Sequence, residues 1–155
     1  MRAFIGVGSN LGDRARLIAD AVAALRRLPR TQVLRVSSLR ETDPVDYLDQ
    51  PRFLNGAIEV ETELEPRPLL EALLSIEHAL GRDRATAPAR GPRPIDLDLL
   101  VYGDSVLDEP DLCVPHARLH ERQFVLEPLA ELDPGLVVPG RGTVESLLAK
   151  LHSNP

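Results

Sequence analysis

The chain has 155 residues, of which 43% are apolar and 27% are charged, and its formal net charge is −6. This composition is typical of one globular domain spanning residues 1–155, and the acidic balance lacks the basic footprint of a nucleic-acid-binding protein. No apolar run approaches the roughly 18 residues of a membrane span, and the single Cys113 excludes an internal disulfide framework and favours a reducing, cytoplasmic compartment.

The spacing of apolar residues predicts alternating strands and helices over the first hundred residues. In chain order we expect a strand at residues 2–7, a helix at 13–28, a strand at 32–39, a loop at 40–51, a strand at 53–62, a helix from Pro66 to Gly81, a loop at 82–94 and a strand at 95–102. Proline and glycine at the two ends of the second helix suit its start and its stop.

The order β-α-β-β-α-β is that of a ferredoxin-like core, which predicts an α+β fold with two helices on one face of the sheet. The near-continuous apolar run at residues 95–102 predicts a central strand. Short strands at 105–107 and 112–114 would form a hairpin, and helices at 124–132 and 143–151 would cover the other face of the sheet.

Two aspartates interrupt the apolar run of the last core strand. Asp96 and Asp98 are two residues apart, so on a strand both carboxylates face the same side. Two such carboxylates repel one another without a cation, and burying them unpaired is costly. Magnesium binds oxygen ligands and shares one or two carboxylates with substrate phosphates, which makes the pair a candidate magnesium site. The alternative is a solvated outer face on which both aspartates pair with arginines.

Arginines crowd the segment that precedes the two aspartates, at Arg82, Arg84, Arg90 and Arg93. Acidic metal ligands beside several guanidinium groups are the combination that a polyphosphate site needs. The chain contains no G-x-x-x-x-G-K-[ST] motif, which excludes a P-loop enzyme.

Five motifs occur in order along the chain and together resemble one enzyme family. They are GSN at residues 8–10, RETDP and DQPRFLN within 40–55, IEHALGRDR at 76–84, GPRPIDLDLL at 91–100 and VPHARLHERQFVLEPL at 114–129. They span nearly the whole chain, and GPR-x-x-DLD followed by VPH and R-x-F is a specific combination. The chain is similar to the 6-hydroxymethyl-7,8-dihydropterin pyrophosphokinases of folate biosynthesis.

The resemblance implies transfer of a diphosphate from ATP to the hydroxymethyl oxygen of the pterin, with release of AMP. It implies ATP as co-substrate, two magnesium ions, and small-molecule substrates rather than nucleic acid or membrane partners; we expect a monomer. The family fold is a three-layer α/β/α single domain built on the ferredoxin-like core, in agreement with the order of elements above.

The resemblance also assigns roles to individual side chains. Asp96 and Asp98 would bind the magnesium ions, and Arg82 and Arg93 would act as catalytic residues on the transferring phosphates. The pterin would contact Thr42, Asp43, Val45, Phe53, Asn55 and Phe124, with its ring stacked between the two phenylalanines. The ATP-binding set would be Glu77, Arg84, Arg93, Leu99, Cys113, His116 and Arg122.

Each of these side chains taken alone has a plain structural explanation. Phe53 and Phe124 suit a hydrophobic core, and Cys113 suits a small buried apolar position. Glu77 suits an exposed helix position and His116 a surface position. Only the joint pattern favours the functional interpretation.

The loop at residues 82–94 departs from the family pattern, because Arg90 occupies a position where an aromatic residue is usual. The loop holds three prolines and no apolar periodicity. We therefore expect it to be mobile in the free protein and to close over the triphosphate of bound ATP.

Two other functions fit parts of the sequence. A polymerase-β-type nucleotidyltransferase also combines a G-S motif with D-x-D, although those motifs lie close together in such enzymes, whereas Ser9 and Asp96 are far apart here. A ferredoxin-like ligand-binding or regulatory domain would not turn over ATP. The nucleotide product separates these alternatives, because diphosphate transfer releases AMP and nucleotidyl transfer releases pyrophosphate.

Overall fold

The computed structural model describes residues 1–44, 49–81 and 93–153. Its centre is an antiparallel sheet in the order β2-β4-β1-β5, with β3 paired to the start of β4. These strands are β1 (Arg2–Ser9), β2 (Thr31–Val36), β3 (Arg40–Thr42), β4 (Phe53–Thr62) and β5 (Asp96–Tyr102). Val45, Arg82, Arg84, Arg90 and most of the loop expected to close over ATP lie outside the described residues.

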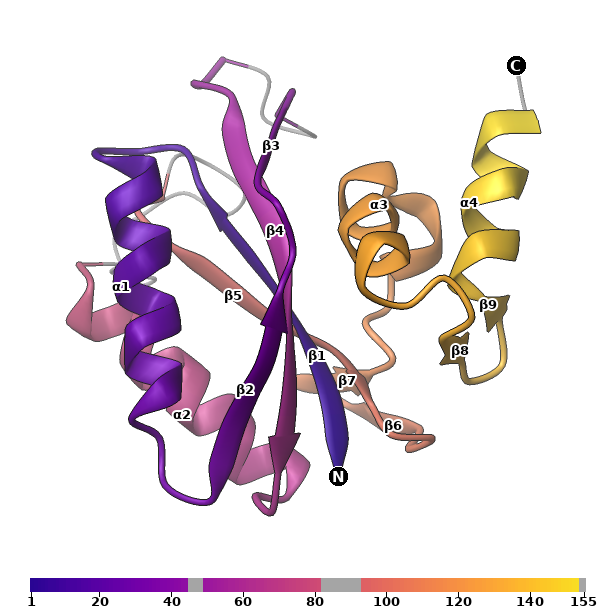
Figure 1. Ribbon diagram of the computed structural model, residues 1–155, viewed down its shortest axis with the longest axis horizontal. Coiled ribbons are helices and arrows are strands. Elements are labelled where there is room, and N and C mark those ends of the chain that lie inside the picture. The colour runs from indigo at the N-terminus through magenta and orange to yellow at the C-terminus, as the bar shows by residue number, and fades with distance from the viewer. Residues whose placement is uncertain (45–48, 82–92, 154–155) are drawn as a thin grey trace.

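Helices cover both faces of this sheet (Figure 1). Helices α1 (Arg14–Arg26) and α2 (Pro66–Ala79) lie on one face, and α3 (Gln123–Leu132) and α4 (Val144–Ser153) lie on the other. The smaller elements are the hairpin β6 (Leu107–Glu109) and β7 (Leu112–Val114), a 3-10 turn at Leu119–Glu121, and the pair β8 (Val137–Val138) and β9 (Gly142–Thr143). None of the described helices is both long and apolar enough to cross a membrane.

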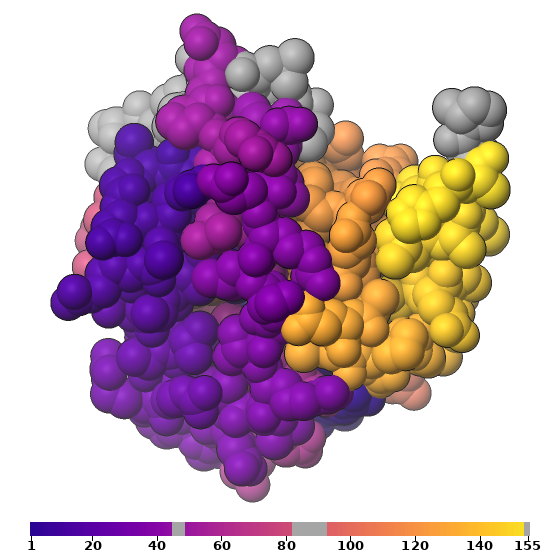
Figure 2. Space-filling model, turned by 45° about the horizontal axis from the view of Figure 1, so that its top comes forward, coloured from indigo at the N-terminus to yellow at the C-terminus, as the bar shows by residue number. Residues whose placement is uncertain are grey.

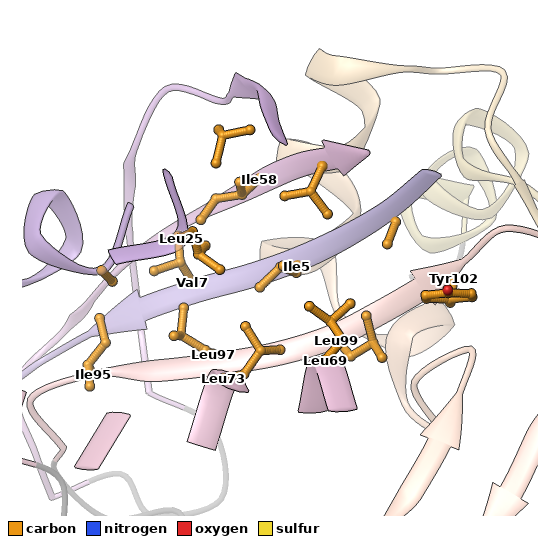
Figure 3. Packing of buried hydrophobic residues seen from close by; sticks show 14 of the residues in the cluster. Ile5, Val7, Leu25, Ile58, Leu69, Leu73, Ile95, Leu97, Leu99 and Tyr102 are labelled. Atoms are coloured by element: carbon orange, nitrogen blue, oxygen red, sulfur yellow. The ribbon is translucent and has the colours of Figure 1, made fainter. Parts of the chain in front are cut away.

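The alternation of side chains along β1 explains why the sheet needs a helical layer on each side. Ile5 and Val7 point to the α1–α2 face, where they join Leu25, Leu69 and Leu97 in one buried cluster (Figure 3). Phe4, the residue between, belongs to a second cluster with residues of α3 and α4. A strand that is covered on both faces reads as a continuous apolar run, because neither face meets water.

The prediction of a mixed helix-and-sheet fold, with two late helices on the second face, is confirmed. The strand at residues 53–62 has the predicted limits, and no helix end differs from prediction by more than two residues. The segment 40–51, predicted as loop, begins instead with β3, whose polar residues lie at the edge of the sheet. Strand β2 ends at Val36 rather than at residue 39, and β6 begins at Leu107 rather than at residue 105.

The prediction that β5 occupies the centre of the sheet is wrong. Strand β5 is last in the strand order and pairs with β1 alone among the described strands. Two groups that do not belong to a strand cover its outer edge. The Leu97 backbone N–H donates to the buried carboxylate of Glu77 at 2.7 Å, and the Leu100 carbonyl accepts from the His116 backbone N–H at 2.9 Å. The apolar run therefore reflects the two helical layers and not a central position.

Glu131 on α3 joins the second helical layer to the segment between β2 and β3. Its carboxylate accepts hydrogen bonds from the Ser38 backbone N–H at 2.7 Å, the Ser38 hydroxyl at 2.6 Å and the Arg40 guanidinium at 2.8 Å. The Ser38 hydroxyl, followed by the Ser38 N–H and Arg40, holds the pKa of Glu131 below its ordinary value of 4.5.

Replacing Glu131 with glutamine is expected to remove one pH-dependent part of the stability. Because the folded-state pKa is the lower one, the carboxylate stabilises the fold above pH 4.5, and this stabilisation is lost as the pH falls through the folded value. The side chain is 35% exposed, so the effect is less than ~1 kcal/mol. Denaturant titrations at neutral and acidic pH measure it, with Glu71→Gln on the exposed side of α2 as the matched control. Identical pH profiles for wild type and Glu131→Gln would contradict the assignment.

Candidate active site

A cleft of about 680 Å³, counted with its open mouth, lies between one face of the sheet and the start of α3. Figure 2 shows α3, in orange, packed beside the purple strands on this side of the molecule. The cleft is lined by Gly6, Val7, Gly8, Thr42, Asp43, Phe53, Asn55, Gly56, Arg93, Asp96, Asp98, Leu100, Arg122, Phe124 and Val125.

Glycines of β1 and β4 form the floor of the cleft, where the lack of side chains lets other groups approach the sheet. A Cβ atom on Gly8 would lie 2.5 Å from Oδ1 of Asn55, which is closer than real Cβ atoms come to an oxygen. Gly8 is paired with Asn55 on one side and with Asp96 on the other. The absent side chain therefore makes room for the Asn55 amide directly above β1.

The Asn55 amide is buried and its orientation is set by β3. Its Nδ2 donates to the hydroxyl of Thr42, so its Oδ1 is the atom above Gly8. Asp43 follows Thr42 at the cleft and forms an ion pair with Arg52 at 3.1 Å. Thr42, Asp43 and Asn55, to which the family resemblance assigns pterin contacts, thus lie together.

Phe53 and Phe124 both line the cleft, although 71 residues separate them in the chain. Each ring carries an arginine of the same site over its face. The guanidinium carbon of Arg93 lies 4.9 Å from the centre of the Phe53 ring, and that of Arg122 lies 5.5 Å from the centre of the Phe124 ring. Each of the two aromatic rings of the cleft therefore has a guanidinium within cation–π distance of its face.

Asp96 and Asp98 face the cleft from the start of β5. They are paired with Gly8 and Gly6 of β1, and both side chains are half-buried at the cleft wall. The prediction that the two carboxylates share one face of a strand is confirmed. Nε of Arg93 lies 3.5 Å from Oδ2 of Asp96, so one guanidinium contacts both an aromatic ring and a carboxylate.

The residues predicted around the nucleotide do not all line this cleft. Arg122 does, whereas Cys113 and His116 line a neighbouring hollow between the β6–β7 hairpin and the 138–141 turn. Burial lowers the pKa of His116; Arg122 lowers it further and Asp96 opposes the shift, so the imidazole is neutral at neutral pH.

Glu77 and Leu99 lie on the α1–α2 side of β5. Leu99 is part of the apolar cluster there, and Glu77 is buried rather than exposed on α2, with its carboxylate on the Leu97 N–H. The structural explanation of an exposed Glu77 is therefore wrong.

Burial raises the pKa of Cys113, which keeps that thiol protonated.

Asn10 lies beside the cleft although no role was predicted for it. Asn10 follows β1, is 2% exposed, and contacts both Arg93 and the segment that leads to Phe53. Its position in the GSN motif was the one sequence signal, and that motif does not reveal which distant backbone groups the side chain contacts.

The sequence matches the family model described as 7,8-dihydro-6-hydroxymethylpterin-pyrophosphokinase (HPPK) over residues 4–134. A protein of Methylorubrum extorquens named 2-amino-4-hydroxy-6-hydroxymethyldihydropteridine pyrophosphokinase is 47% identical over 150 residues, which cover 97% of this chain and 93% of that protein. The protein of the same name from Bacillus subtilis is 48% identical over 130 residues, which cover 84% of this chain and 77% of that protein.

Longer proteins also contain a matching region. The folic acid synthesis protein fol1 of Schizosaccharomyces pombe is 45% identical over 137 residues, which are 88% of this chain and 18% of fol1. Among solved structures, the wild-type HPPK-DHPS of Plasmodium falciparum with pterin and p-hydroxybenzoate superimposes on 96% of this chain with a TM-score of 0.73. The match covers 41% of that longer chain at 16% identity, so it supports the fold alone.

Proposed function

Because the chain belongs to the 7,8-dihydro-6-hydroxymethylpterin-pyrophosphokinase family, we propose that the cleft described above is its active site. The enzyme transfers a diphosphate from ATP to the hydroxymethyl group of 6-hydroxymethyl-7,8-dihydropterin and releases AMP, in folate biosynthesis. One observation carries the assignment of the site. Phe53 and Asn55 come from β4 and the pair Asp96 and Asp98 from β5, and all four line a single cleft.

The pterin ring would bind at the end of the cleft formed by β3, β4 and the start of α3. Phe53 and Phe124 would stack on its two faces, since offset stacking of flat rings is favourable. The Asn55 amide has a second N–H and an oxygen beyond its bond to Thr42, which suits a ring edge that presents both donors and acceptors. Asp43 and Val45 would complete the contacts.

The donor set at the other end of the cleft fits magnesium. Asp96 and Asp98 supply two carboxylates on one face of β5, which is fewer ligands than octahedral magnesium requires. Phosphate oxygens and water would therefore complete the coordination, as magnesium prefers. Two bound ions would act as Lewis acids on the ATP phosphates.

The arginines would bind and stabilise the transferring group. As the hydroxymethyl oxygen releases its proton to solvent and attacks the β-phosphorus, the bond between that phosphorus and the α,β-bridging oxygen breaks and negative charge moves onto AMP. Arg93, next to Asp96, would donate to the phosphate oxygens that gain this charge, together with Arg82. Arg122 would bind the triphosphate, and Arg84, Cys113 and His116 would surround the rest of the nucleotide. Glu77 and Leu99, on the α1–α2 side of β5, would support that strand rather than line the cleft.

The strand order and the two helical layers support a ferredoxin-like core extended into a three-layer α/β/α domain over residues 1–155. Ile5 and Phe4 of one strand belong to the two different clusters, so both layers share a single sheet. We place the enzyme in the cytoplasm as a monomer.

The nucleotide product tests the proposed chemistry directly. Incubation with ATP, magnesium and the hydroxymethyl pterin is expected to yield AMP and the pterin diphosphate in equal amounts, and chromatography with phosphorus NMR identifies both. Release of pyrophosphate would favour the nucleotidyltransferase alternative. Absence of turnover with saturable pterin binding would favour the ligand-binding domain.

Replacing Gly8 with alanine is expected to raise the KM for the pterin about tenfold, with little change in the KM for ATP, because one or two hydrogen bonds from Asn55 are lost. The added methyl group would meet Oδ1 of Asn55 at 2.5 Å and displace the amide. Gly135→Ala is the matched control, because its Cβ would meet its nearest neighbour at an ordinary 3.7 Å. Steady-state kinetics with each substrate varied decides, and an unchanged pterin KM would contradict the placement of Asn55 in the pterin site.

A further inference from the structure

The side-chain amide of Asn10 is buried, and both its oxygen and its nitrogen form hydrogen bonds with other residues. Its Oδ1 accepts from the Arg93 backbone N–H at 2.9 Å. Its Nδ2 donates to the Gln50 side-chain oxygen at 2.8 Å and to the Pro51 carbonyl at 3.0 Å. Its own backbone N–H donates to the Arg93 carbonyl at 3.2 Å.

These contacts fix the orientation of the amide and the residue type. The oxygen faces a backbone donor and the nitrogen faces a backbone carbonyl, so the amide cannot be turned over without losing both bonds. An aspartate of the same shape would accept from Arg93 but could not donate to Gln50 or Pro51. An alanine would lose every side-chain contact and leave buried polar groups unsatisfied.

The two segments that Asn10 joins are the two that meet again in the cleft. Pro51 precedes Phe53 by two residues, and the Arg93 guanidinium lies 4.9 Å from the Phe53 ring centre. The same guanidinium contacts Asp96 at 3.5 Å. Asn10, residues 50–53 and Arg93 therefore form a closed ring of contacts at the cleft.

From this ring we infer that Asn10 is a positioning residue, which holds the Phe53 ring and the Arg93 guanidinium in one fixed relation. Through it, the pterin face of Phe53 is aligned with the arginine that contacts the phosphates. The inference rests on the proposed assignment of the cleft as the active site. Misplacement of a reacting group by about 1 Å costs about a hundredfold in rate, so a residue that touches neither substrate controls turnover here.

Asn10→Asp tests this role with the least change in shape. It is expected to lower kcat/KM for the pterin about a hundredfold, while the affinity for an ATP analogue stays within about twofold. Asn10→Ala, which also releases Arg93, is expected to lower kcat further. Ser9→Ala is the matched control, because Ser9 is also buried in the same motif but, among the residues that the structure describes, its hydroxyl bonds only to the Leu11 carbonyl. Thermal melts verify that each variant is folded. If a variant does not fold, Gln50→Leu replaces it, because this change removes one acceptor of Asn10 at a half-buried position.

A double-mutant cycle separates positioning from general loss of stability. If Asn10 acts through Phe53, then Asn10→Asp lowers kcat/KM for the pterin less in the Phe53→Leu background than in the wild type. The two effects are expected to differ by more than about twofold. Additive defects, or equal losses of pterin and ATP affinity, would overturn the positioning role. If Phe53→Leu alone leaves pterin binding unchanged, the active-site assignment fails instead, so the two failures are distinguishable.

Discussion

Asp96→Asn and Asp98→Asn are each expected to lower turnover by about a hundredfold or more at saturating magnesium. An asparagine keeps the shape of the side chain and its place on β5, but it removes the charge that would bind the cation. The fold is expected to remain intact, because both side chains lie at the wall of an open cleft. Removing one of two neighbouring negative charges is expected to leave the melting temperature of the metal-free protein equal or slightly raised.

Turnover assays over a range of magnesium concentrations measure the loss, and calorimetry with magnesium-ATP shows whether it is a loss of binding. Asp104→Asn is the matched control, since Asp104 follows the same strand but is exposed at the far end from the cleft. Near-wild-type turnover in either cleft variant would rule out the magnesium assignment. A comparable loss in Asp104→Asn would show that net charge, and not the cleft, determines the rate.

Phe53→Leu and Phe124→Leu are expected to weaken pterin binding by about tenfold each, while ATP binding changes little. Stacking contributes about 0.5–1.5 kcal/mol beyond the buried area, and leucine keeps most of the burial while losing the flat face. Leucine is preferable to alanine at Phe53, which is 8% exposed, because a cavity there would destabilise the fold as a whole. Calorimetric titration with pterin and with a non-hydrolysable ATP analogue measures the two affinities separately.

Phe4 provides a matched control for these variants. It is buried on the same face of the sheet, and Arg2 lies over its ring at 4.9 Å, the distance of Arg93 from Phe53. Phe4→Leu therefore removes the same kind of contact away from the cleft, and pterin affinity is expected to be unchanged. Equal weakening of both ligands by Phe53→Leu would mean that Phe53 is a core residue.

Local patterns predicted much of the fold, and the exceptions have physical reasons. The strand at residues 53–62 and the two late helices follow from apolar periodicity. Strand β3 was missed, because three polar residues at a sheet edge carry no periodic signal, and their pairing with Phe53 and Asn55 is set by distant residues. The position of β5 was wrong because burial on both faces gives the same apolar run at the edge as at the centre.

The sequence predicted those parts of the candidate site that a short motif defines. It did not predict those that depend on tertiary contacts. The period of a strand is enough to place Asp96 and Asp98 on one face. The contact of Glu77 with the Leu97 N–H joins a helix to a strand edge 20 residues away, and no spacing rule anticipates it. The same holds for Asn10, whose partners lie 40 to 83 residues along the chain.

The covered outer edge of β5 also bears on how the enzyme avoids aggregation. A short, apolar strand with an open edge is a template for adding further strands from other chains. Here the Glu77 carboxylate and the His116 backbone satisfy the outward groups of Leu97 and Leu100, so no continuous ladder is offered. If α2 detaches during partial unfolding, the Glu77 part of that cover is lost, and Asp96 and Asp98 become the charges that interrupt the exposed apolar run. The proposed magnesium ligands then act as gatekeepers, and asparagine variants that keep the native fold are expected to aggregate sooner on heating.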